Sequence, residues 1–389
     1  MTMRQDFEEI VLFIRKLYNK PEGFIPLHAP VFMGNEKKYL NDCIDSTFVS
    51  SVGKYVDRFE EMVAEFTGAK KAIVTVNGTN ALHLALLMAG VKTGDEVITQ
   101  PLTFIATANA ISYIGAKPIF IDVDCDTMGM SPNALRTWLK ANIKPSIASK
   151  PINKSTGKEI SSILPMHTFG HPCRIDEIIA IGEEFNIPVV EDAAESLGSY
   201  YKGKHTGTYG KLGVLSFNGN KTITTGGGGM ILTNDIELGN FIKHLTTQSK
   251  IPHPWEYDHD NIGYNYRMPN INAALGVAQM EKLAYYLENK RHVAEKYRYF
   301  FNNMTIKFVD EFSNSKSNFW LNAILLKDRN QRNEFLQFSN ENAVMTRPIW
   351  KLMYKLNMFK NCQTGDISNS LYLEDRIINL PSSVINEHN

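Results

Sequence analysis

The chain has 389 residues, of which 43% are hydrophobic and 21% are charged. These proportions are ordinary for a globular protein, and the length favours two or more structural units rather than one. Lysine and arginine together number 41, as do aspartate and glutamate, so the charge gives no reason to expect nucleic acid or a membrane surface as a partner.

The N-terminal stretch predicts an amphipathic helix rather than a secretion signal, because Asp6, Glu8 and Glu9 interrupt its apolar residues. No segment is long and apolar enough to span a bilayer. The four cysteines stand at positions 43, 125, 173 and 362, without metal-binding or redox spacing. We therefore expect reduced thiols, no metal and a cytoplasmic protein.

Between about residues 70 and 235, short apolar runs alternate with helical patterns, which predicts a mainly parallel sheet covered on both faces. The expected strands are 71–76, 96–100, 118–124, 162–168 and 187–192. The expected helices are 81–90, 104–114, 132–141 and 174–186. Two further apolar runs, VLSFNG and GMILTN, have no room for a helix between them, so this part can be antiparallel.

After about residue 250 the pattern changes to a smaller α+β unit. A long helix is expected over 270–303, followed by strands at 306–312 and 318–326 and a helix near 330–341. Disorder is expected at 154–162 and in the C-terminal tail.

NGTNALHLAL places a strand end directly before the start of a helix. The helix amides and dipole favour an anion there, Gly78 allows a close backbone approach, and Thr79 adds a hydroxyl. An ordinary helix cap is the alternative.

Two further strand ends carry side chains suited to a flat ligand. Phe104, in TFIATANAI, can stack on a planar ring, although a core phenylalanine is the alternative. VVEDAAESLGS ends a strand in Glu191 and Asp192, and a buried carboxylate is costly unless a group such as a protonated pyridine nitrogen needs it. A helix cap is the alternative for that carboxylate.

The most specific segment is SFNGNKTITTGGGGM, in which Ser216, Lys221 and four consecutive glycines follow an apolar strand. Burial favours the neutral amine of a lysine, which can attack an aldehyde, and glycines let the backbone pass close to a ligand. A flexible surface hairpin is the alternative. GYNYRMPNINAALG places Asn265 and Arg267 before the long helix, where they could also belong to a capping loop.

In this order the five segments resemble the DegT/DnrJ/EryC1/StrS family of sugar aminotransferases, from about residue 25 to 380. The resemblance implies a pyridoxal 5'-phosphate (PLP) enzyme of fold type I, with an α/β large domain built on a mainly parallel mixed sheet and a smaller C-terminal α+β domain. It also implies a homodimer with active sites at the subunit boundary. We expect an N-terminal helix in 1–24, the PLP-binding domain in 25–250, and the connecting helix with the small domain in 251–389.

The same resemblance assigns roles to individual residues. Lys221 would hold PLP as a Schiff base and Asp192 would pair with the pyridine nitrogen, and these two are the expected catalytic residues. The other expected cofactor contacts are Gly78, Thr79 and Ser216 at the phosphate, Phe104 on the ring, Glu195 near the phenolic oxygen, and Asn265 from the partner subunit. The expected substrate contacts are His167, Gly53, Lys54, Arg267, Arg347 and Trp350.

Several segments, including FWLNAILL and TRPIWKLM, look most like the 4-amino-sugar enzymes of legionaminic acid and bacillosamine synthesis. That likeness implies L-glutamate as donor and a nucleotide-linked 2-acetamido-2,6-dideoxy-4-ketohexose as acceptor. A 3-aminotransferase acting on a 3-keto sugar and a non-catalytic PLP-binding regulator are the alternatives. A PLP-dependent sugar dehydratase is disfavoured, because that subgroup has histidine where this chain has Lys221.

Overall fold

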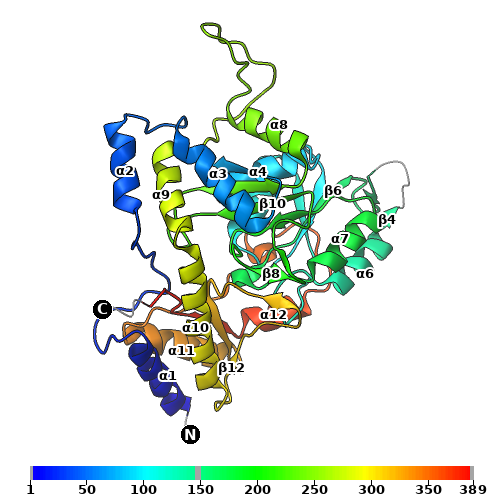
Figure 1. The fold of residues 1–389 in the computed structure, drawn as a ribbon. Helices are drawn as coiled ribbons and strands as arrows, with labels where there is room; N and C mark the ends of the chain where they lie inside the picture. Colours follow the sequence, from blue (N-terminus) through cyan, green and yellow to red (C-terminus); the bar gives the residue numbers. More distant parts are fainter. Residues whose placement is uncertain (1–2, 145–149, 386–389) are drawn as a thin grey trace.

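The computed structural model describes residues 3–144 and 150–385. Its larger part is built on an extended mixed sheet (Figure 1). The first four strands lie in the order β1 (Lys71–Thr75), β11 (Gly229–Thr233), β10 (Leu212–Ser216) and β7 (Val190–Asp192). Parallel bridges from Ile163 to Val189 and from Met166 to Asp192 continue the sheet into β6 (Ile160–Leu164), β2 (Glu96–Thr99) and β3 (Lys117–Phe120).

The strand directions agree with the sequence. The described pairs are parallel except those of β11, which is antiparallel to both β1 and β10. The mainly parallel sheet and the antiparallel section formed by VLSFNG and GMILTN are therefore confirmed.

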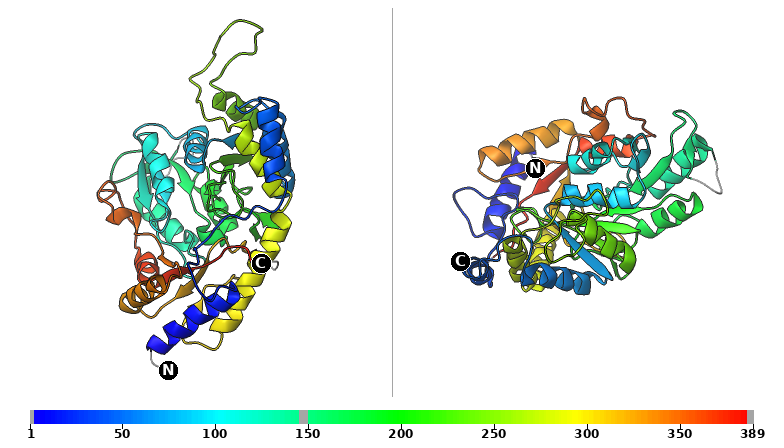
Figure 2. Two further views of the ribbon diagram at one scale, coloured as in Figure 1. Left: turned by 90° about the vertical axis from the view of Figure 1, so that its left-hand side faces the viewer. Right: turned by 90° about the horizontal axis from the view of Figure 1, so that it is seen from above.

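Helices cover both faces of this sheet (Figure 2). They are α3 (Lys54–Thr67), α4 (Gly78–Met88), α5 (Ile105–Tyr113), α6 (Pro132–Asn142), α7 (Ile175–Glu184), α8 (Ile236–Thr246) and α9 (Asn270–Met280). Successive side chains of a strand point to opposite faces. On β11, Met230 and Leu232 pack with α3 and α9, whereas Ile231 packs with α4, α5 and α8. Both faces are thus apolar, as expected for a buried parallel sheet.

The smaller part contains a second, antiparallel sheet. Its strands lie in the order β12 (Lys307–Phe308), β14 (Asn322–Leu325), β16 (Ile377–Leu380) and β15 (Arg347–Pro348). The helices around it are α1 (Met3–Leu17), α10 (Leu283–Phe301), α11 (Arg329–Glu341) and α12 (Ser368–Glu374). The N-terminal helix packs here (Figure 1). Its Phe7 and Ile10 belong to one apolar cluster with Tyr297 and Phe335.

The remaining elements are short. They are α2 (Glu36–Asp45), β4 (Ile143–Lys144), β5 (Ile152–Asn153), β8 (Tyr200–Tyr201), β9 (Lys204–His205), β13 (Ser315–Lys316) and two 3-10 turns (Thr168–Gly170, Met353–Lys355). The α/β fold with a smaller α+β part is confirmed, whereas the boundaries expected after residues 24 and 250 stay predictions. No helix within the described ranges is long and apolar enough to cross a membrane.

Two sequence expectations were wrong. The long helix of 270–303 is divided into α9 and α10, because the Lys282 amide donates to the Gln279 carbonyl (3.1 Å) and tightens the turn between them. The segment 154–162 is structured: the Asn153 amide and the Lys158 carbonyl close a turn (2.9 Å), and Ile160 begins β6. The end of the C-terminal tail, 386–389, lies outside the described residues.

An arm formed by residues 247–266 projects from the body (Figures 1 and 2). Antiparallel bridges join Thr247 to Asn265 and Lys250 to His259 along it. Its tip exposes apolar side chains: Trp255 is 75% exposed and Tyr257 is 82% exposed. Within one chain, these large side chains have little to pack against.

Candidate active site

A cavity of about 540 Å³ lies where the carboxyl ends of several strands of the large sheet face the small domain. The sequence-predicted residues that line it are Gly78, Thr79, Phe104, Asp192, Glu195, Ser216, Lys221, Arg347 and Trp350. Open α/β sheets bind ligands at this edge. The cavity is therefore the candidate active site.

One end of the cavity is suited to an anion. The Asn77 side chain caps α4 by accepting from the Asn80 amide (2.8 Å), and α4 begins at Gly78 beside Ser216. The first amides of a helix have no partner within it and attract negative charge. A Cβ on Gly229 would lie 2.4 Å from the Asn77 carbonyl oxygen, so glycine there lets two chain segments converge on this end.

Asp192 ends β7 and faces the cavity. Its Oδ2 accepts from the Thr107 hydroxyl (2.7 Å) and its Oδ1 accepts from the Ala194 amide (3.2 Å). Burial raises the pKa of Asp192, and the bond from Thr107 opposes that shift. Among the described residues no ion pair neutralises this carboxylate, which leaves it available to a cationic ligand group.

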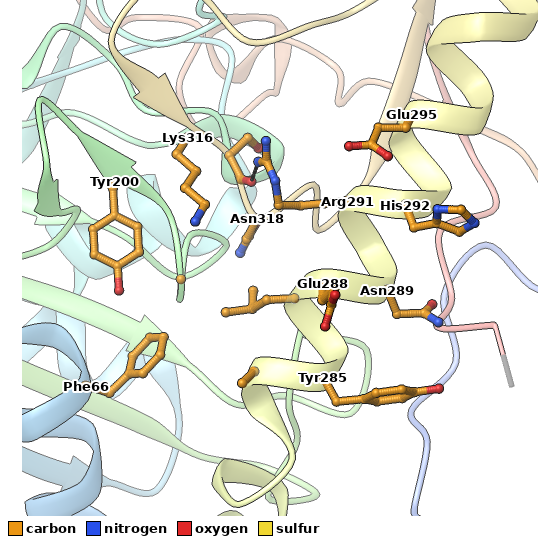
Figure 3. A pocket seen from close by; sticks show the side chains of 14 residues that line it. Phe66, Tyr200, Tyr285, Glu288, Asn289, Arg291, His292, Glu295, Lys316 and Asn318 are labelled. Carbon is orange, nitrogen blue, oxygen red and sulfur yellow. Dashed lines mark hydrogen bonds between the residues drawn. The ribbon is translucent and has the colours of Figure 1, made fainter. Parts of the chain in front are cut away.

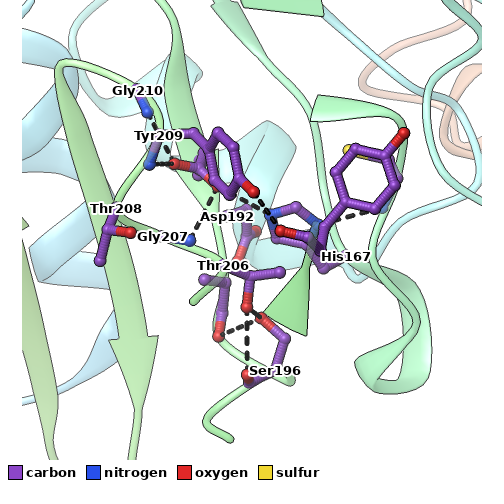
Figure 4. Close-up of polar contacts among 12 residues, drawn as sticks. His167, Asp192, Ser196, Thr206, Gly207, Thr208, Tyr209 and Gly210 are labelled. Atoms are coloured by element: carbon purple, nitrogen blue, oxygen red, sulfur yellow. Dashed lines mark hydrogen bonds and ion pairs between the residues drawn. The ribbon is translucent and has the colours of Figure 1, made fainter. Parts of the chain in front are cut away.

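The neighbouring Glu191 does not line the cavity, and its side chain is turned towards the loop whose Gly207, Tyr209 and Gly210 are labelled in Figure 4. Its carboxylate accepts 2.7 Å hydrogen bonds from three backbone amides, those of Gly207, Tyr209 and Gly210. It also lies 3.0 Å from Nε2 of His167, whose Nδ1 accepts from the Cys173 amide (3.2 Å). In this arrangement Nδ1 accepts, and Nε2 carries the proton that is donated to Glu191.

The substrate contact expected for His167 is corrected by this geometry. The side chain is fully buried, both ring nitrogens have protein partners, and it does not line the cavity. His167 instead supports the strand that presents Asp192, because its backbone amide donates to the Asp192 carbonyl (3.1 Å).

Lys221 lies between a carboxylate and an aromatic ring. Its Nζ is 3.1 Å from Glu195 Oε1 and 3.8 Å from the ring centroid of Trp320. Glu195 Oε2 accepts from the Phe169 amide (2.9 Å), so both carboxylate oxygens act as acceptors. Burial raises the pKa of Glu195 to about 7, while the Lys221 charge works in the opposite direction.

Trp320 was missed from the sequence, although it lies in the FWLNAILL segment. Two hydrogen bonds fix its position: the backbone amide donates to Asn318 Oδ1 (2.8 Å), and the indole N–H donates to the Asn220 carbonyl (2.6 Å). Its carbonyl accepts from Nζ of Lys290 (3.2 Å), a lysine that is 1% exposed. The indole is thus a fixed platform for the Lys221 amine, with an attraction of about 0.5–2 kcal/mol.

The small domain closes the other side of the cavity. Phe104 is 48% exposed, and its ring centroid lies 6.3 Å from that of Trp350. Arg347 lines the rim, where its Nη1 donates to Asn340 Oδ1 (3.1 Å) and the Thr346 carbonyl (3.0 Å). An aromatic face and a cation therefore border the opening.

Four other expected residues do not line this cavity. Gly53 precedes α3, where an added Cβ would lie 2.3 Å from the Asn270 side chain, and Lys54 pairs with Asp42 (2.7 Å). Asn265 and Arg267 stand at the base of the arm. One chain alone does not bring these four residues to the candidate site.

A second cavity, of about 770 Å³, lies between α10 and the β8–β13 region (Figure 3). It presents Tyr200 and Lys316 on one side and Glu288 and His292 of α10 on the other (Figure 3). None of the sequence-predicted site residues lines it, so its larger volume does not make it the reaction site.

Comparison with known proteins identifies the family to which the chain belongs. The sequence matches the DegT/DnrJ/EryC1/StrS aminotransferase family over residues 32–386. The chain belongs to this family. GDP-perosamine synthase of Escherichia coli O157:H7 is 40% identical over 360 residues, which cover 92% of this chain and 93% of the relative. The putative pyridoxal phosphate-dependent aminotransferase EpsN of Bacillus subtilis (strain 168) is 36% identical over 365 residues, 92% of this chain and 90% of EpsN.

Solved structures share the fold of this aminotransferase. A DegT DnrJ EryC1 StrS aminotransferase from Brucella abortus superimposes with a TM-score of 0.79 at 26% identity, over 90% of both chains. The PLP form of the putative sugar aminotransferase Spr1654 from Streptococcus pneumoniae gives a TM-score of 0.83 at 22% identity, over 94% of this chain and 95% of that one. The protein is a PLP-dependent aminotransferase of fold type I, acting in amino-sugar biosynthesis.

The residues of this aminotransferase fit PLP at its phosphate, its ring, its ring nitrogen and its aldehyde. The start of α4 with Ser216 suits the phosphate, the half-exposed ring of Phe104 suits a planar ring, and the Asp192 carboxylate suits a protonated ring nitrogen. The Lys221 amine lies in the same cavity. When bound, PLP supplies an electron sink for cleavage of a bond at the α-carbon of an amino donor.

Proposed function

We propose that this aminotransferase moves the amino group of L-glutamate to the C4 keto group of a nucleotide-linked 4-keto-6-deoxyhexose. The observation that carries the proposal is one cavity holding Lys221, Glu195 and Asp192, in a chain related to sugar aminotransferases. The non-catalytic alternative is set aside, because relatives are named as aminotransferases. A 3-keto sugar is the rival acceptor.

We propose that the Lys221 amine transfers protons during the reaction. Its amine can accept a proton from the α-carbon of the bound amino donor and deliver it to the carbon that carried the cofactor's aldehyde, as transamination requires. Glu195, at 3.1 Å, holds the amine in place through one carboxylate oxygen. Asp192, buried at the end of β7, would keep the ring nitrogen of the cofactor protonated.

The names of the relatives favour a GDP-linked acceptor. Three are named GDP-perosamine synthase, from Escherichia coli O157:H7, Vibrio cholerae and Caulobacter vibrioides, at 40%, 36% and 34% identity. The 2-acetamido-2,6-dideoxy-4-ketohexose of legionaminic acid or bacillosamine-type synthesis is the second candidate, and only the wording of several sequence segments supports it. For either sugar, Arg347 and Trp350 at the rim would contact the substrate.

We also propose that the enzyme acts as a homodimer in the cytoplasm. Asn265 and Arg267 lie at the base of the arm and outside the cavity of their own chain, which fits a role at the cavity of a partner subunit. Gly53 and Lys54 are proposed to act at the same boundary. The free cysteines suit a reducing compartment.

The test is a panel of GDP- and UDP-linked 4-keto sugars, with and without a 2-acetamido group, and one 3-keto sugar. Each is supplied with L-glutamate and the PLP-loaded protein, and the amino sugar and oxoglutarate are measured. We expect the highest kcat/KM with a GDP-linked 4-keto sugar. An amino product formed only from the 3-keto sugar would overturn the C4 assignment, and formation by Lys221→Ala would overturn the role of Lys221.

A further inference from the structure

We propose that Thr107 is a positioning residue for this reaction, as the last member of a buried hydroxyl chain that keeps the Asp192 carboxylate ionised and oriented. This series of hydrogen-bonded hydroxyls begins at Thr103 and leads through Thr107 to Asp192. This inference deepens the proposed function, because it concerns the residue that we assign to the cofactor's ring nitrogen.

This series of hydroxyl groups is short and fully buried. The hydroxyl oxygens of Thr103 and Thr107 are 2.6 Å apart, and Thr107 Oγ1 is 2.7 Å from Asp192 Oδ2. Both threonines are 0% exposed. At the end away from Asp192, Thr103 Oγ1 lies 2.9 Å from Sδ of Met166, an acceptor that competes with Thr107 for the single hydroxyl hydrogen of Thr103. Water therefore cannot replace a missing hydroxyl without a rearrangement of the core.

The direction of the hydrogen bonds depends on the charge of Asp192. An ionised carboxylate only accepts, so Thr107 donates to Asp192 and Thr103 donates to Thr107. If Asp192 were protonated, it could donate to Thr107, and the chain would then end with Thr103 donating to the thioether of Met166. The reversed arrangement contains only neutral hydrogen bonds, whereas the bond from Thr107 to an ionised Asp192 is charge-assisted and roughly twice as strong as a neutral one. The chain therefore biases Asp192 towards its ionised form.

This bias opposes the cost of burying the carboxylate. Asp192 is 2% exposed, and burial raises its pKa, while the Thr107 bond is the largest influence in the other direction. The other charged or titratable groups that act on Asp192 are Lys221, His167 and Glu195, and none of them hydrogen-bonds to its carboxylate within the described residues. Loss of the Thr107 hydroxyl should raise the pKa of Asp192 further.

Binding of PLP to the apoprotein gives a readout that does not depend on turnover. We compare the wild type, Thr107→Val and Thr107→Ser, using PLP and its 1-deaza analogue, in which C–H replaces the ring nitrogen. We expect Thr107→Val to bind PLP about tenfold more weakly at neutral pH, the lower end of what one hydrogen bond to a charged group contributes. Thr107→Ser should restore most of the affinity, because it keeps the donor.

The analogue separates a role at the ring nitrogen from a change in cavity shape. With no ring nitrogen, the charge on Asp192 has no partner, so wild type and Thr107→Val should bind the analogue with similar affinity. For PLP, the acidic limb of the affinity-versus-pH curve should move upward by about one pH unit in Thr107→Val. Equal losses with PLP and the analogue, or an unshifted acidic limb, would overturn the proposal.

Two further variants keep the test decisive. Thr99→Val is a matched control: it also removes a fully buried hydroxyl, which donates to the Leu164 carbonyl (2.8 Å), but Thr99 does not line the cavity. We expect its PLP affinity to match the wild type. If Thr107→Val does not fold, Thr103→Val replaces it, with a smaller loss that still requires the ring nitrogen. Failure of the wild type to bind PLP would instead overturn the proposed function itself.

Discussion

Replacing Glu195 with glutamine should change how the stability of the apoprotein depends on pH. Glu195 is 3% exposed, and burial raises its pKa from 4.5 to about 7. A carboxyl with a raised pKa binds more protons in the folded state than in the unfolded state between these two values. The stability that it contributes is therefore present at low pH and is lost as the pH rises through about 7.

The size of this effect follows from the two pKa values. A shift from 4.5 to about 7 corresponds to roughly 3 kcal/mol between the extremes, and to about 2.5 kcal/mol between pH 5 and pH 8. Glutamine has nearly the same shape but does not titrate. Its single carbonyl oxygen can accept from the Phe169 amide or from Lys221, but not in both present positions, so a constant loss of about 1 kcal/mol is also expected.

The assay is urea unfolding of both apoproteins at several pH values. The free energy of unfolding of the wild type minus that of Glu195→Gln should fall by about 2.5 kcal/mol from pH 5 to pH 8. Groups that titrate equally in both proteins cancel in this difference. Glu288→Gln, which removes an exposed carboxylate on α10, controls for the loss of one charge. A difference that stays constant with pH would refute the reasoning and show that Glu195 is ionised throughout this range.

Three further predictions test other parts of the structure. Lys221→Ala should retain PLP through the phosphate and ring contacts but lose borohydride-dependent covalent labelling and transamination; labelling at another lysine would contradict the assignment. Burial lowers the pKa of Lys290 from 10.5 to about 7, so the unfolded state binds more protons between these values. Wild-type stability relative to Lys290→Met should therefore rise by about 2 kcal/mol from pH 7 to pH 9 in urea unfolding, and parallel curves would rule this out. Mixing Asn265→Ala with Lys221→Ala should restore part of the activity through hybrid dimers with one intact site, whereas no recovery despite proven subunit exchange would exclude action in trans.

The sequence by itself determined the elements and the residues whose environment is local. The alternation of apolar runs and helical patterns depends on periodicity within short windows, so the parallel sheet and most helices were predictable. Gly78, Asp192, Ser216 and Lys221 each stand where a strand ends or a glycine-rich turn follows, and the topology of a parallel sheet brings such ends together.

Only the tertiary structure decided which side chains from distant parts of the sequence contact each other. Glu191 and Asp192 are adjacent in sequence, yet the pleat of β7 turns one towards backbone amides and His167 and the other towards the cavity. The contacts of Thr107 with Asp192 and of Trp320 with Lys221 join segments far apart in the chain, and no local pattern encodes such pairs. Their positions follow from the packing of helices and of the small domain against the sheet, because the burial and charge of each group depend on neighbours that only the complete fold supplies.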